Sequence, residues 1–189
     1  MELNKKISDK TARVGVVGLG YVGLPLAVAF ARRGYRVTGI EVDPRRAANL
    51  RKGRSYIEDV SSVELKRLLH EGLLEVRSDD AALSRLDAVL ICVQTPLRKT
   101  KEPDISNILT ACGRIAPRLK RGQLVVLEST TYPGTTEEAV RPALEKSGLV
   151  AGRDFWLAFS PERVDPGNKR WNIENTPKVV GGVNAASTK

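Results

Sequence analysis

The sequence predicts an α/β protein whose mostly parallel sheet is doubly wound, with helices on both faces. Along the whole chain, short apolar runs rich in Val, Leu and Ile alternate with segments whose apolar residues have helical spacing. The run AVLICV at 88–93 is unbroken by polar residues, which is typical of a strand covered on both faces. In such sheets, ligands bind beyond the carboxyl ends of the strands.

Each element has its own signals. We expect strands at 13–18, 36–41, 74–77, 88–93, 124–128, 155–159 and 178–180, and helices at 21–33, 44–52, 61–71, 105–119 and 135–146. Gly34 and Gly53 follow two of the helices, where a left-handed residue commonly ends a helix. Ser61 with Glu64 predicts a capping box. We expect one domain over residues 1–189.

Composition narrows the class of function. The formal net charge is +9, but the short basic clusters at 32–33, 45–46 and 118–121 have no aromatic residues between them. This argues against a nucleic-acid partner and fits an anionic small molecule. One His and two Cys predict neither a metal site nor a disulfide framework. No apolar run is long enough to span a bilayer and residues 1–13 lack a signal-peptide core, so we expect a cytoplasmic protein without a membrane partner.

A glycine-rich turn joins the first predicted strand to the first predicted helix. Its sequence, GLGYVG, matches the G-x-G-x-x-G pattern of Rossmann dinucleotide-binding domains, in the strand–turn–helix context that the pattern requires. Gly18 permits the tight turn, Gly20 the close approach of a pyrophosphate, and Gly23 the packing of helix against strand. The alternative is an ordinary turn with incidental glycines. The predicted cofactor-binding residues here are Gly18, Leu19, Gly20, Tyr21, Val22 and Gly23.

An acidic residue at the end of the second predicted strand indicates which dinucleotide binds. Glu41 lies roughly 20 residues beyond the turn, where a carboxylate accepts hydrogen bonds from the adenosine ribose. The same carboxylate would repel a 2′-phosphate, so we predict NAD rather than NADP. Arg45 and Arg46 weaken the prediction, because an arginine can serve a 2′-phosphate.

Four segments together resemble the N-terminal NAD-binding domain of the UDP-glucose and GDP-mannose dehydrogenase family. They are GLGYVGLPLAVAFARRGYRVTGIEVD at 18–43, VQTP at 93–96, ESTTYPGTT at 128–136 and FSPERVDPGN at 159–168. The sequences of the last two segments are most similar to those of bacterial UDP-N-acetylglucosamine and UDP-N-acetylmannosamine 6-dehydrogenases. The resemblance covers nearly the whole chain and implies oxidation of a sugar C6 alcohol to a carboxylate, with two NAD per turnover.

The resemblance also implies roles for single residues. Thr130 would hydrogen-bond a catalytic water, and Glu162 would assist hydrolysis of a covalent intermediate and contact substrate. From the sequence alone, Thr130 could equally be a capping residue and Glu162 a solvated loop acid. The further residues implied to contact NAD are Arg46, Val93, Thr95, Pro96, Ser129 and Thr130, and those implied to contact the nucleotide-sugar are Arg163 and Asn168.

The chain departs from the family in length. Family enzymes continue with a central helix and a second domain that supplies the cysteine nucleophile and most UDP contacts. Neither Cys92 nor Cys112 has the surroundings of that nucleophile, and both are predicted to be buried apolar side chains. We therefore predict the NAD-binding domain of a UDP-sugar 6-dehydrogenase, inactive alone, whose full-length form is a homo-oligomer. The alternatives are a non-catalytic NAD-binding or regulatory module and a relative of the β-hydroxyacid dehydrogenases.

Overall fold

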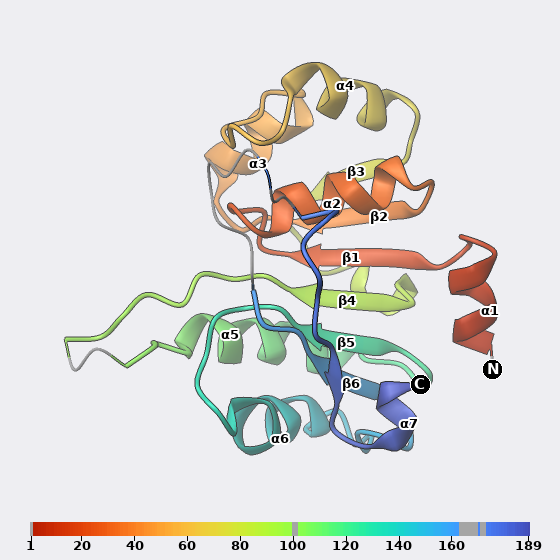
Figure 1. The fold of residues 1–189 in the computed structure, drawn as a ribbon, viewed down its shortest axis with the longest axis vertical. Coiled ribbons are helices and arrows are strands. Elements are labelled where there is room, and N and C mark those ends of the chain that lie inside the picture. The colour runs from red at the N-terminus through yellow and green to blue at the C-terminus, as the bar shows by residue number, and fades with distance from the viewer. Residues whose placement is uncertain (1, 100–101, 163–169, 171–172) are drawn as a thin grey trace.

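The computed structural model describes residues 2–99, 102–162, 170 and 173–189. Within them, seven strands form one sheet in the order β3-β2-β1-β4-β5-β6-β7 (Figure 1). All neighbouring strands are parallel except β6 and β7, which are antiparallel. The strands are β1 (Arg13–Val17), β2 (Arg36–Ile40), β3 (Leu74–Arg77), β4 (Ala88–Ile91), β5 (Leu124–Leu127), β6 (Trp156–Phe159) and β7 (Gly181–Gly182).

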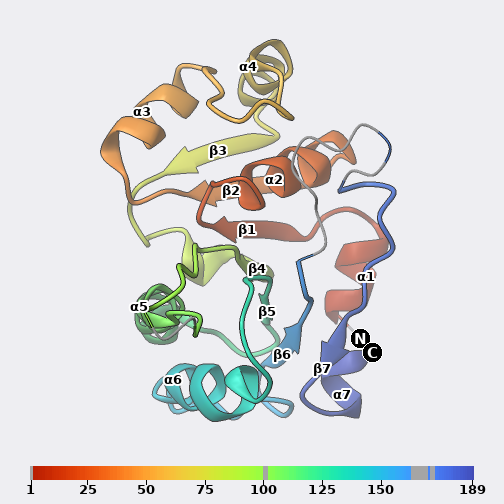
Figure 2. The same cartoon turned by 60° about the vertical axis from the view of Figure 1, so that its left-hand side comes forward.

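Helices cover both faces of this sheet, which confirms the predicted doubly wound α/β architecture (Figures 1 and 2). One core packs α2, α3 and α4 against the sheet, and a second core packs α5 and α6 against the opposite face. The α-helices are α1 (Glu2–Ser8), α2 (Gly23–Arg32), α3 (Pro44–Arg51), α4 (Ser62–His70), α5 (Ser106–Ile115), α6 (Arg141–Glu145) and α7 (Ala185–Thr188). Among the helices of the described residues, none combines the length and the hydrophobicity that a membrane span needs.

The alternation of side chains along a strand explains how one short segment serves both cores. Val16 is fully buried in the core that contains α2, whereas its neighbour Val17 is buried in the core that contains α5. Leu90 and Ile91 divide between the two cores in the same way. The central strands are therefore apolar on both faces, as their sequences predicted.

The structure corrects the prediction of a strand at 178–180. The strand begins three residues later, where Gly181 and Gly182 pair with β6. Val179 and Val180 are β-branched but remain 61% and 56% exposed. At Gly182 a Cβ would lie within 2.5 Å of the Thr188 amide nitrogen, so α7 packs too closely for a side chain there. Close approach between backbones, rather than β-propensity, sets the position of this strand.

Three smaller differences concern helices. The predicted capping box is incomplete, because Ser61 accepts a hydrogen bond from the Val63 N–H while Glu64 instead pairs with Arg32 on α2. The helix expected at 135–146 begins with a π-helical turn, Thr136–Val140, before α6. The helix expected at 105–119 continues past α5 only as a 3₁₀ turn, Ala116–Arg118. Helix α1 was not predicted.

Candidate cofactor site

The three glycines of the turn occupy three different environments. Gly18 has φ +91°, and a Cβ there would lie 2.7 Å from the Cys92 carbonyl oxygen. A Cβ on Gly23, the first residue of α2, would overlap the Gly18 carbonyl oxygen. A Cβ on Gly20, by contrast, would meet nothing within 4 Å. Gly18 and Gly23 are thus required by the fold itself, whereas the space beside Gly20 is open and can admit a ligand.

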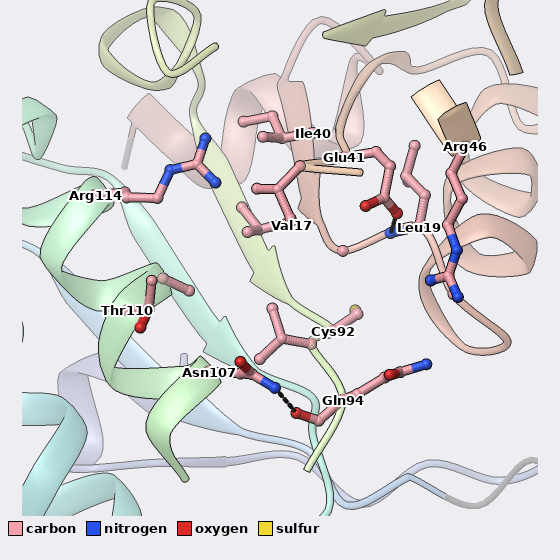
Figure 3. A pocket seen from close by; sticks show the side chains of 15 residues that line it. Val17, Leu19, Ile40, Glu41, Arg46, Cys92, Gln94, Asn107, Thr110 and Arg114 are labelled. Atoms are coloured by element: carbon pink, nitrogen blue, oxygen red, sulfur yellow. Dashed lines mark hydrogen bonds between the residues drawn. The ribbon is translucent and has the colours of Figure 1, made fainter. Parts of the chain in front are cut away.

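Glu41 lies directly after β2 and points back at this turn (Figure 3). Its carboxylate accepts hydrogen bonds from the Leu19 N–H at 3.2 Å and the Asp43 N–H at 2.9 Å. Glu41 is only 5% exposed. A carboxylate can accept about four hydrogen bonds, so it retains acceptor capacity for the hydroxyls of a ribose. Asp43 in turn caps α3 by accepting from the Arg45 and Arg46 amides, and these bonds lower the pKa of its carboxyl group.

A first pocket, of about 180 Å³, opens between this turn and α5 (Figure 3). It brings together the predicted residues Gly18, Leu19, Gly20, Glu41, Arg46 and Val93. Its other wall was not predicted and consists of Asn107, Thr110 and Arg114 on α5. These polar residues recur every three or four positions, so helical periodicity could have revealed a polar face turned toward the site.

A second pocket, of about 330 Å³, lies on the other side of the turn and shares four residues with the first: Gly20, Cys92, Val93 and Gln94. The structure gathers here Tyr21 and Val22, which were predicted from the turn, and the remaining described residues that the resemblance implied: Thr95, Pro96, Ser129, Thr130 and Glu162. Gly23, also predicted to bind the cofactor, lines neither pocket and packs against Gly18 instead. Ser129 is 3% exposed, and its hydroxyl donates to the Val93 carbonyl at 2.9 Å. Ser129 therefore fastens the end of β5 to the end of β4, whereas Thr130 beside it is exposed. Arg163 and Asn168 lie outside the described residues.

The wall of the second pocket includes a buried carboxylate that belongs to an ion pair. The Glu128 carboxylate, 3% exposed at the end of β5, contacts the Lys178 ammonium group. Neither residue was predicted from the sequence to be part of the site. Lys178 reaches Glu128 from a segment 50 positions away, and no local pattern signals such a pairing.

Cys92 lines both pockets but lacks the properties of a nucleophile. Burial raises the pKa of its thiol to about 12, and burial does the same for Cys112 on α5. Thiolates are the reactive form of cysteine, so both side chains are inert near neutral pH. The prediction that they are buried apolar side chains is confirmed.

Two pockets on either side of a glycine turn, with a carboxylate after the second strand, define a dinucleotide-binding Rossmann domain. Residues 12–189 match the sequence profile of the UDP-glucose/GDP-mannose dehydrogenase family, NAD binding domain. The chain belongs to this family and is its NAD-binding domain. The open space at Gly20 and the Glu41 carboxylate fit NAD.

Relatives and solved structures agree with this assignment. The chain is 40% identical to the UDP-N-acetyl-D-glucosamine 6-dehydrogenase of Pseudomonas aeruginosa over 92% of its own length and 40% of that protein. It is 38% identical to the UDP-N-acetyl-D-mannosamine dehydrogenase of Pyrococcus horikoshii, over 90% and 41%. The structure of an NDP-N-acetyl-D-galactosaminuronic acid dehydrogenase from Methanosarcina mazei Go1 superposes with a TM-score of 0.87 at 36% identity, over 98% and 42%. The chain thus spans about two fifths of the length of these relatives.

Proposed function

We propose that this chain provides the NAD-binding part of an enzyme that oxidises the C6 alcohol of a UDP-sugar to a carboxylate in two NAD-dependent steps. The substrate is UDP-N-acetylglucosamine, UDP-N-acetylmannosamine or UDP-glucose, and the whole protein is a homo-oligomer. The observation that carries the proposal is the second pocket, where Thr130 and Glu162 line the same cavity as Thr95, Pro96 and the glycine turn.

In this proposal the first pocket holds the adenosine half of NAD and the second holds the nicotinamide half, which accepts a hydride when bound. Glu41 accepts hydrogen bonds from the ribose, and Arg46 flanks it. Thr130 and Glu162 bind and orient a water molecule beside the reacting carbon, and Arg163 and Asn168 bind the nucleotide-sugar. A carboxylate product also requires a nucleophile that holds the aldehyde as a covalent adduct. Cys92 and Cys112 do not fit this role, because both thiols are buried and protonated.

The second candidate is a non-catalytic NAD-binding module, which the burial of both cysteines favours. The two candidates differ in whether the parent protein turns over sugar. NADH absorbance should be followed with the three UDP-sugars, using the 189-residue chain and the product of the complete reading frame that contains it.

We expect the 189-residue chain to bind NAD without turnover and the complete product to oxidise one of the sugars. A complete product that binds NAD but oxidises none of them would favour the module. Robust turnover by the 189-residue chain that survives Cys92→Ser and Cys112→Ser would contradict the division of labour proposed here.

A further inference from the structure

Leu19 lies between the first two glycines of the turn, and its side chain, its N–H and its carbonyl each contact another part of the chain. Its side chain is fully buried and lies against Gly39 of β2, where a Cβ would come within 2.7 Å of the Leu19 Cδ1 atom. Its N–H donates to the Glu41 carboxylate. Its carbonyl oxygen accepts a hydrogen bond of 2.7 Å from the Tyr56 hydroxyl. Tyr56 belongs to the irregular segment between α3 and α4, 37 positions along the chain.

The bond to Tyr56 determines where the next amide points. The Leu19 carbonyl belongs to the same peptide unit as the Gly20 N–H, and the described residues contain no cis peptide bond. In a planar trans peptide, C=O and N–H point in opposite directions. Fixing the carbonyl on Tyr56 therefore directs the Gly20 N–H away from Tyr56. Gly20 is also the residue beside which the crevice is open.

Tyr56 is suited to be a permanent donor. The residue is half-buried, and burial, reinforced by the charge of Glu41, raises its pKa to about 12. Its hydroxyl thus stays protonated at physiological pH. The ring also lies under Arg46, whose guanidinium carbon is 5.6 Å from the ring centroid, a cation–π contact. One side chain thereby contacts both the phosphate-binding turn and a basic residue of the first pocket.

We propose that Tyr56 is a positioning residue for NAD: its hydroxyl fixes the Leu19–Gly20 peptide so that the Gly20 N–H faces the pyrophosphate of the cofactor. Tyr56 itself need not touch NAD. This inference rests on cofactor binding alone and is independent of which sugar, if any, the parent enzyme oxidises.

The substitution Tyr56→Phe tests the proposal, because it removes the hydroxyl and keeps the ring beneath Arg46. Tyr35→Phe is a matched control, since the Tyr35 hydroxyl also donates to a backbone carbonyl, that of Ile7, at 2.9 Å and far from both pockets. The dissociation constants of NAD, by calorimetry, and of adenosine, by NMR titration, should be measured with the melting temperature of each variant.

We expect Tyr56→Phe to weaken NAD binding about five- to tenfold, as loss of one neutral hydrogen bond predicts. Adenosine binding should change less than twofold, because adenosine has no pyrophosphate. Tyr35→Phe should leave both constants unchanged at a comparable melting temperature. The proposal is overturned if NAD affinity is unchanged in folded Tyr56→Phe, or if NAD and adenosine weaken equally. If Tyr56→Phe melts too low to measure, the NMR shift of the Gly20 amide on adding NAD to the wild type decides: no shift would overturn the proposal.

Discussion

The first and second pockets, which together form the two halves of the proposed NAD site, differ in how their polar groups are held. Around the first pocket, each oxygen of Glu41 accepts a backbone N–H and the Leu19 carbonyl is bonded to Tyr56. Around the second, the buried Ser129 hydroxyl donates to the Val93 carbonyl, and the buried Glu128 carboxylate pairs with Lys178. The buried Ser160 hydroxyl, two positions before Glu162 in the sequence, has no hydrogen-bond partner in the described part of the chain. Buried polar groups are normally satisfied, so one that is not needs a reason. The first half is thus held by hydrogen bonds from Glu41 and Tyr56 to the turn, whereas the second half depends on an ion pair with a distant segment and has the unpartnered Ser160 hydroxyl near it.

Gly20→Val should produce the largest effect on cofactor binding, because Gly20 belongs to both halves. The Cβ would enter open space, so the variant should fold, but its methyl groups would occupy the position of the pyrophosphate. We expect NAD affinity by calorimetry to fall more than about a hundredfold. Gly113→Val on α5 is the control, since a Cβ there also meets nothing within 4 Å. Unchanged NAD affinity in folded Gly20→Val would remove the phosphate-binding assignment of the turn.

Lys178→Met, a change beside the second pocket, should have the next largest effect, which is a loss of the chain's stability. It leaves the Glu128 carboxylate buried without its partner, and breaking a buried pair from one side destabilises by about 3 kcal/mol. Urea denaturation would measure the change in the free energy of unfolding. The double variant Glu128→Gln, Lys178→Met should recover most of the loss.

Arg67→Met is the matched control for Lys178→Met, because it breaks the surface pair Arg67–Glu71. Exposed pairs of this kind contribute less than about 1 kcal/mol. If Lys178→Met destabilised the chain no more than Arg67→Met does, the buried pair would not distinguish the second half from an ordinary surface.

Glu41→Ala should have a moderate effect on the first half. We expect NAD affinity to fall about tenfold, because the variant loses the ribose acceptor together with the bond that holds the Leu19 amide. NADP affinity should fall less, since the repulsion of its 2′-phosphate also disappears. Calorimetric titration with both cofactors gives the ratio of affinities, and Glu58→Ala, an exposed acid in the same region, serves as control. A wild type that prefers NADP would contradict the role assigned to Glu41.

The sequence was sufficient to predict those parts of the site that depend on local patterns. The turn at 18–23 and Glu41 stand at spacings imposed by one βαβ unit, so they could be predicted before the structure was known. Tyr56 and Lys178 could not, because each acts through a contact formed when a distant irregular segment folds onto the sheet. The prediction of a strand at 178–180 was wrong for a related reason, because packing against α7 determines the position of the observed strand, β7.

The smallest effect on the chain is expected from changes at the two cysteines. Cys92 lines both pockets, and Cys112 is buried on α5. Because burial raises the pKa of Cys92 and Cys112 to about 12, both thiols stay protonated at pH 8. Iodoacetamide should therefore leave the native chain unmodified at pH 8 and alkylate both residues in guanidinium chloride, as mass spectrometry would show.

The raised pKa values of the two thiols also determine whether the chain gains or loses stability at alkaline pH. The folded chain keeps these thiols protonated above their ordinary pKa of 9.0, whereas the unfolded chain releases the protons. Their contribution to stability is therefore complete below pH 9 and is lost progressively between about pH 9 and 12. Cys92→Ala should flatten that part of the stability profile. Rapid alkylation of native Cys92 at pH 8, blocked by NAD, would instead show a reactive thiol at the junction of the two pockets. The second pocket would then contain its own nucleophile, and the conclusion that neither cysteine fits the covalent step would be wrong.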